Sequence, residues 1–134
     1  MFVDQKAFKG STVISSDGTY FLGVQFDSNL VLYKREENGT VAVWHTNTVK
    51  VPDVAFLRLD EDGNLCLYKT DGISKVWESQ TSGSGATRLT VENSGDLSLY
   101  DSNGKEVWNA GRYEGLCHVL DPFFNRSTKI TIIT

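Results

Sequence analysis

Three stretches of the chain alternate apolar with polar residues in closely similar ways. The stretches "LGVQFDSNLVLY", "LRLDEDGNLCLY" and "LTVENSGDLSLY" end at Tyr33, Tyr68 and Tyr100, so they recur at spacings of 35 and 32 residues. Each is followed by a Val-Trp pair, whose tryptophans are Trp44, Trp77 and Trp108. An alternation with a period of two predicts β-strands. Its recurrence predicts an internal triplication in which each copy forms one small antiparallel sheet.

Four positions of each stretch are aliphatic in all three copies. They are Leu22, Val24, Leu30 and Leu32, then Leu57, Leu59, Leu65 and Leu67, then Leu89, Val91, Leu97 and Leu99. Because every second side chain of a strand shares one face, we expect these residues to point into a common core. One small sheet cannot bury its apolar face alone, so we predict an all-β fold of three sheets around a pseudo-threefold axis. We expect the tryptophans to pack in this core; alternatively, they are stacking platforms for a ligand.

The other face of the first stretch is polar. It carries an amide, a carboxylate, a second amide, an aliphatic side chain and a phenol: Gln25, Asp27, Asn29, Val31 and Tyr33. These groups are poor core material, but they offer hydrogen-bond donors and acceptors beside one apolar contact. Such a surface suits a ligand that is hydroxylated at its edges and apolar on one face. A sugar has both properties.

A single straight strand would spread these five residues too far apart to form one site. From Gln25 to Tyr33 it would extend roughly 26 Å, at about 3.3 Å per residue. Turn residues at the matching place in the second copy, Asp62-Gly63-Asn64, indicate that the chain reverses there. We therefore predict a hairpin with an odd-numbered loop centred on Ser28. This loop places Gln25 across from Val31 and keeps all five residues on one face.

The length of 134 residues predicts a single domain. We place its three repeats at about residues 11–47, 48–81 and 82–111. Residues 112–134 depart from the repeat and end in the β-branched sequence "KITIIT". We expect this segment to form a strand that closes a sheet of its own chain or is exchanged with a second chain, which would make a homodimer.

The charge pattern argues against several classes of partner. The formal net charge is −4, and the thirteen Lys and Arg residues are scattered, unlike those of a nucleic-acid-binding surface. No apolar stretch approaches the roughly twenty residues that span a bilayer, so we expect no membrane insertion. The start, "MFVDQKAFKG", lacks the apolar core of a signal peptide, which favours the cytoplasm over secretion.

Candidate catalytic and metal-binding groups are few. The two cysteines, Cys66 and Cys117, are interpreted as reduced thiols, with a single bridge between them as the alternative. The two histidines, His45 and His118, have no cysteine or carboxylate partners at the spacing of a metal site or a catalytic triad. The sequence "DEDGN" at residues 60–64 has its glycine at the wrong place for a calcium loop. We therefore expect no cofactor, no metal and no enzymatic activity.

The spaced set Gln25-x-Asp27-x-Asn29-x-Val31-x-Tyr33 resembles the mannose-binding signature of the monocot, or bulb-type, mannose-binding lectins. The triplication is similar to the three subdomains of the β-prism II fold of that family, over about residues 10–110. The resemblance implies that Asp27 and Asn29 hold the axial 2-hydroxyl of mannose. It also implies that Gln25 takes the 3-hydroxyl and Tyr33 the 4-hydroxyl, while Val31 packs on the sugar ring.

The signature is incomplete in the other two copies. The second copy keeps Asp62, Asn64 and Tyr68. Asp60 replaces the glutamine and Cys66 replaces the valine, so we predict a weaker second site. The third copy keeps only the tyrosine, and we predict no working site there. Its five residues are Glu92, Ser94, Asp96, Ser98 and Tyr100.

These features together predict a lectin that binds mannose or mannose-terminated glycans reversibly, without a metal and mainly through the first repeat. The alternative is a protein-interaction or cytoskeleton-associated module that uses the same scaffold and binds little sugar. A β-trefoil lectin also has a threefold repeat, but its repeats are usually longer than these.

Overall fold

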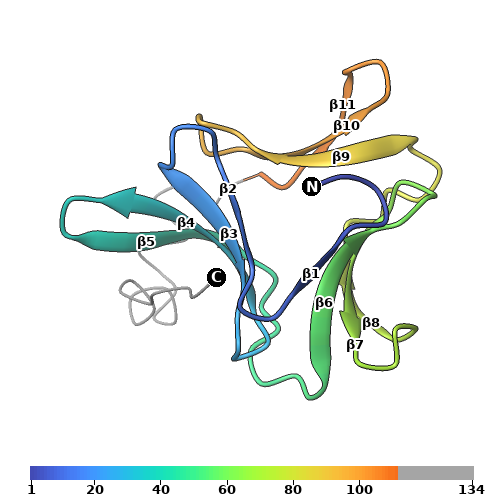
Figure 1. Ribbon diagram of the computed structural model, residues 1–134, viewed down its shortest axis with the longest axis horizontal. Helices are drawn as coiled ribbons and strands as arrows, with labels where there is room; N and C mark the ends of the chain where they lie inside the picture. Colours follow the sequence, from blue (N-terminus) through green and yellow to red (C-terminus); the bar gives the residue numbers. More distant parts are fainter. Residues whose placement is uncertain (112–134) are drawn as a thin grey trace.

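Three antiparallel β-sheets surround a common centre in the computed structural model, which describes residues 1–111 (Figure 1). Strands are the only regular secondary structure in this range, and no helix within it is long and apolar enough to cross a membrane. The all-β fold with three sheets is therefore confirmed. The predicted closing or exchanged strand in residues 112–134, together with Cys117 and His118, lies outside the described residues.

Each sequence repeat forms at least three consecutive strands of one sheet. The first sheet has the order β2 (Thr12–Ile14), β3 (Tyr20–Val24), β4 (Leu30–Glu36) and β5 (Gly39–His45). The second has the order β1 (Lys6–Phe8), β6 (Val54–Leu59), β7 (Leu65–Lys69) and β8 (Lys75–Glu78). The third has the order β11 (Glu106–Asn109), β10 (Leu97–Asp101) and β9 (Ala86–Val91).

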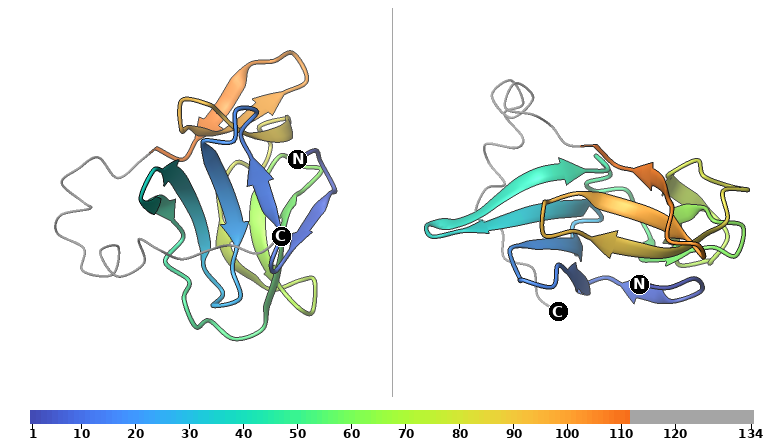
Figure 2. Two further views of the ribbon diagram at one scale, coloured as in Figure 1. Left: turned by 60° about the vertical axis from the view of Figure 1, so that its left-hand side comes forward. Right: turned by 90° about the horizontal axis from the view of Figure 1, so that it is seen from above.

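The first fourteen residues run along all three sheets, which the repeat pattern does not predict (Figures 1 and 2). They supply β1 to the second sheet and β2 to the first. At the third sheet, the Leu89 amide donates to the Met1 carbonyl (2.7 Å) and the Val3 amide donates to the Thr87 carbonyl (3.0 Å). The N-terminal segment thus ties the three sheets together at one end of the prism.

The inward faces of the sheets form one core. All twelve aliphatic positions of the repeat are buried there, with at most 4% of any side chain exposed. Burying a side chain of this size stabilises a protein by about 1.5–3 kcal/mol, so the repeated face is the main source of stability. The predicted core is confirmed.

The tryptophans of the three repeats contact one another on this core. Trp44 is 8% exposed, while Trp77 and Trp108 are half-buried. The ring centroids of Trp44 and Trp77 are 5.5 Å apart, and those of Trp77 and Trp108 are 6.1 Å apart, both in edge-to-face geometry. Such edge-to-face pairs are favourable aromatic contacts. The predicted core packing is confirmed, with Trp44 the most deeply buried of the three.

The hairpin of the first repeat has the predicted parity but a different centre. The pairing of Gly23 with Val31, and the hydrogen bond from the Gln25 amide to the Asn29 carbonyl (3.0 Å), centre the odd-numbered loop on Asp27. The prediction of a loop centred on Ser28, with Gln25 across from Val31, was therefore wrong by one residue. The reason is that Ser28 supplies the left-handed residue of the turn (φ 79°), which follows the loop centre.

Candidate functional site

The first outer face brings the five predicted site residues together. Gln25 follows β3, Asp27 and Asn29 lie in the hairpin loop, and Val31 and Tyr33 lie on β4. The Gln25 side chain satisfies its hydrogen bonds when its Nε2 donates to Asp27 Oδ1 (2.9 Å) and its Oε1 accepts from the Tyr33 hydroxyl. The phenol, the amide and the carboxylate therefore form one hydrogen-bonded row.

The row lies on an apolar floor and ends at an exposed carboxylate. Tyr33 stacks on Phe21, with ring centroids 5.2 Å apart, and both pack with Val31 and Ala42 in a small second cluster. Asp27 is exposed, whereas Gln25 is 5% and Tyr33 0% exposed. Burial raises the pKa of Tyr33 to about 12, so its hydroxyl stays protonated well into the alkaline range.

Asn29 is buried and holds the hairpin against the segment that follows β5. Its Oδ1 accepts from the Thr48 amide (3.1 Å) and from Thr46 Oγ1 (3.2 Å), and its Nδ2 lies 3.2 Å from His45 Nδ1. Thr48 Oγ1 in turn donates to the Ser28 carbonyl (2.7 Å). Because a buried polar group must be paired, this network fixes the loop that carries Asp27.

The second repeat contains the same network. Asn64 Oδ1 accepts from the Thr81 amide (3.1 Å) and from Ser79 Oγ (3.2 Å), and Thr81 Oγ1 donates to the Gly63 carbonyl (2.6 Å). The hydroxyl-bearing residues that bond to these asparagines were not identified from the sequence alone. Their signal is the hydroxyl pattern after the tryptophan in "WHTNT" and "WESQT", which "WNAGR" in the third repeat lacks.

The second outer face has the same frame but different contacts. Arg58 Nε donates to Asp60 Oδ1 (2.7 Å), and Asp60 Oδ2 accepts from the Tyr68 hydroxyl and from Cys66 Sγ (3.4 Å). The Arg58 guanidinium also lies 4.7 Å from the centroid of the Tyr68 ring. Burial raises the pKa of the Cys66 thiol to about 12, so this free, buried cysteine stays protonated and unreactive. The predicted second-site residues Asp60, Asn64 and Tyr68 therefore already have protein partners.

The third outer face retains little of the signature. The Tyr100 hydroxyl donates to Glu92 Oε1, and the Arg88 guanidinium lies 4.4 Å from the centroid of the Tyr100 ring. Neither Ser94 nor Asp96 restores the amide and aliphatic chemistry of the first repeat.

Two outward-facing positions on the strands beside the signature strand differ in size and charge among the three faces. One lies on the strand before the hairpin, across from the valine position of the signature. The other lies on the tryptophan-bearing strand, across from the tyrosine. The pairs of residues there are Gly23 and Ala42 in the first repeat, Arg58 and Lys75 in the second, and Thr90 and Glu106 in the third.

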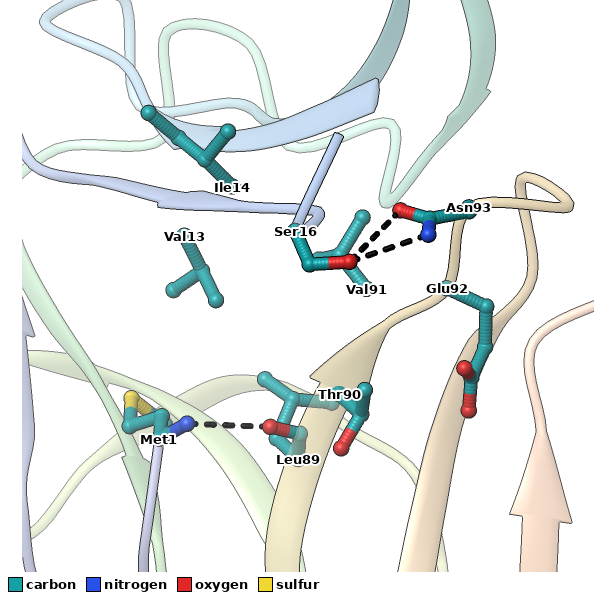
Figure 3. A pocket seen from close by; sticks show the side chains of 9 residues that line it. All are labelled: Met1, Val13, Ile14, Ser16, Leu89, Thr90, Val91, Glu92 and Asn93. Atoms are coloured by element: carbon teal, nitrogen blue, oxygen red, sulfur yellow. Dashed lines mark hydrogen bonds between the residues drawn. The ribbon is translucent and has the colours of Figure 1, made fainter. Parts of the chain in front are cut away.

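A separate pocket of about 300 Å³ lies between β2 and β9 (Figure 3). The Met1 ammonium group donates to the Leu89 carbonyl (2.9 Å) on one side, and the Ser16 hydroxyl contacts the Asn93 amide (2.9 Å) on the other. The pocket contains none of the signature residues of the first repeat. It lies beside the part of β9 that does not pair with Met1–Val3.

His45, the histidine within residues 1–111, has a structural role. His45 Nδ1 accepts from the Asn47 amide (3.1 Å) and contacts Asn29, which uses this ring to brace the hairpin. Within the same residues, no group of three or more His, Cys, Asp or Glu is arranged to hold a metal ion.

Three antiparallel sheets around a shared core define a β-prism, and the outer face of its first sheet carries the complete polar signature. The chain is 29% identical to the B-type lectin plumieribetin of Scorpaena plumieri over 109 residues, which are 80% of this chain and 89% of that lectin. The monomeric monocot mannose-binding lectin of Gastrodia elata superposes with a TM-score of 0.69 at 25% identity, over 83% of this chain and 94% of that chain. No protein-family model matches.

The snowdrop (Galanthus nivalis) mannose-specific agglutinin, solved with methyl-α-D-mannoside, is also similar. Its TM-score is 0.64 at 25% identity, over 86% of this chain and 97% of that chain. The fold, the signature of the first repeat and these similarities agree. The chain has the β-prism II fold, and it is similar in sequence and in structure to the bulb-type lectins.

Proposed function

We propose that the protein binds mannose and mannose-terminated glycans through the first outer face. One observation carries the proposal: Tyr33, Gln25 and Asp27 form a continuous hydrogen-bonded row, and the neighbouring position 23 has no side chain. The mannoside bound by the snowdrop agglutinin supports the same ligand class for this chain.

The chemistry of the row suits adjacent sugar hydroxyls. The exposed Asp27 carboxylate offers acceptors, the Gln25 amide offers both a donor and an acceptor, and Val31 supplies an apolar contact for ring carbons. These groups meet hydroxyls directly, so the proposal requires no metal. Each such hydrogen bond contributes about 0.5–1.5 kcal/mol, which makes the affinity for one monosaccharide modest.

A glycan array with competition by methyl mannoside tests the proposed function. We expect binding to mannose-terminated glycans that free methyl mannoside abolishes and methyl galactoside does not. A flat array, combined with specific capture of a protein partner, would instead support the protein-interaction module.

We further propose that two chains associate by exchanging the strand at residues 129–134. The described part of the chain supports this idea, because the third sheet has three full strands where the other two have four, which leaves part of β9 as an open edge. Exchange would place two first-repeat sites on one particle and allow crosslinking. Deleting residues 129–134 should then lower the mass measured by sedimentation to that of a monomer. A full-length chain that already sediments as a monomer would contradict the exchange.

A further inference from the structure

The second outer face has a side chain where the first has none. Gly23 lies across from Val31 on β3 and β4, and Arg58 lies at the equivalent position across from Cys66 on β6 and β7. Both positions face outward, because the residues on either side of each belong to the core. Arg58 therefore projects onto the surface that corresponds to the proposed mannose site.

Arg58 contacts the second-repeat equivalents of two residues, Gln25 and Tyr33, that are proposed to contact the sugar in the first repeat. Its Nε donates to Asp60, which replaces the signature glutamine, and its Nη2 donates to the Tyr68 hydroxyl (3.2 Å). The guanidinium also lies over the Tyr68 ring, and its side chain is only 27% exposed. A planar cation thus occupies the polar row and its aromatic floor together.

A second cation borders the same surface. Lys75 lies across from Tyr68, where the first repeat has Ala42, and its Nζ is 6.0 Å from the centroid of the Tyr68 ring. The two positions that are small and uncharged in the first repeat are therefore both long and cationic in the second. Displacing Arg58 would leave the Asp60 carboxylate without its ionic partner, which a neutral sugar hydroxyl replaces poorly.

We propose that Arg58 is a built-in occupant of the second site, which closes that site to mannose and leaves one mannose site per chain. This inference rests on the proposed function of the first face and deepens it. The weaker second mannose site expected from the sequence is then a site that a side chain of the protein itself occupies. It also predicts that the site can be opened, because the Asn64 network and the Phe56–Tyr68 stack that frame it are intact.

Amide chemical shifts in a two-dimensional NMR titration with methyl α-mannoside test the proposal, because they locate weak binding. The variant Arg58→Gly, Asp60→Gln, Cys66→Val copies the first repeat, and the matched control Asp60→Gln, Cys66→Val keeps Arg58. We expect signals of residues 25–33 to shift in all three proteins. Signals of residues 60–68 should shift only in the variant without Arg58.

The signals of the two faces distinguish the two proposals. Shifts at residues 60–68 in the wild-type protein or in the control, or no shifts there in the opened variant, would overturn the role of Arg58. An absence of shifts at residues 25–33 in every protein would instead contradict the proposed function of the first face. Should the Arg58→Gly change unfold the protein, Arg58→Ala in the same background answers the same question, because alanine also removes the guanidinium without the flexibility of glycine.

Discussion

The first and second outer faces share a frame but differ at two signature positions and at two flanking positions. Both stack a phenylalanine on the signature tyrosine, with ring centroids 5.2 Å apart in the first and 5.3 Å in the second. Both are braced by a buried asparagine that accepts from a backbone amide and a hydroxyl. The first then has Gly23 and Ala42 around its polar row, where the second has Arg58 and Lys75. The residues that flank the polar row are therefore small and uncharged in the first face and cationic in the second.

Substitution of a tryptophan on the inward face should affect stability and leave mannoside binding unchanged. Trp44→Ala should lower the free energy of unfolding by about 3–5 kcal/mol, because its ring packs on the core and against Trp77. Trp77→Ala should cost less, because that side chain is only half-buried. Urea unfolding measures both losses. A Trp44 variant that unfolds like the parent but no longer binds mannoside would mean that the ring is a ligand platform.

The equivalent residues Asn29 and Asn64 distinguish a structural role in the hairpin from a role in ligand binding. Asn29→Ala and Asn64→Ala should each lower the free energy of unfolding by about 1–3 kcal/mol, because each leaves a buried backbone amide and hydroxyl without their acceptor. Only Asn29→Ala should also abolish mannoside binding. Thermal unfolding and calorimetry on the same samples measure the two effects. Loss of binding in the Asn64 variant would contradict the assignment of the site to the first repeat.

The smallest expected effect is the alkaline titration of Tyr33. Its pKa in the folded protein is raised from 10.0 to about 12, so the folded state keeps a proton that the unfolded state loses. The resulting stability is fully present below pH 10 and is lost as the pH rises from about 10 to about 12. Tyrosinate absorbance followed against pH should show one fewer late-titrating phenol in Tyr33→Phe. A Tyr33 that ionises near pH 10 would indicate an open, solvated phenol.

The inward faces, and the gathering of the five signature residues on the first outer face, could be predicted because a period-two pattern carries them. Leu22, Leu32 and their equivalents alternate with the polar row, and one face cannot be buried without exposing the other. The odd parity of the hairpin follows from the same alternation. The centre of the loop does not follow from the alternation. Ser28 adopts a left-handed conformation, which serine rarely does, so its residue type gives no sign of the turn. The equivalent residue of the second repeat is Gly63, a residue type that does indicate such a conformation.

The features that sequence could not predict depend on strand pairings and side-chain contacts that no repeated pattern marks. β1 and β2 are three residues long and pair with strands of different repeats, so no local period indicates them. Arg58 resembles an ordinary polar residue of an alternating strand, and its position over Tyr68 becomes visible only with the register of β6 on β7. The replacement of glutamine by Asp60 is visible in the sequence, but the partner that neutralises it is not.

Calorimetric titration of methyl α-mannoside into the matched variants Asp27→Asn and Asp62→Asn tests whether the first repeat holds the single mannose site. Each aspartate accepts its loop's backbone amide at 3.0 Å, from Asn29 and Asn64 respectively, and asparagine can keep that contact. Of the two aspartates, only Asp27 is proposed to contact the sugar. We expect one site per chain in the wild-type protein, none with Asp27→Asn, and one with Asp62→Asn. Two sites in the wild-type protein, or binding that survives in Asp27→Asn, would contradict it.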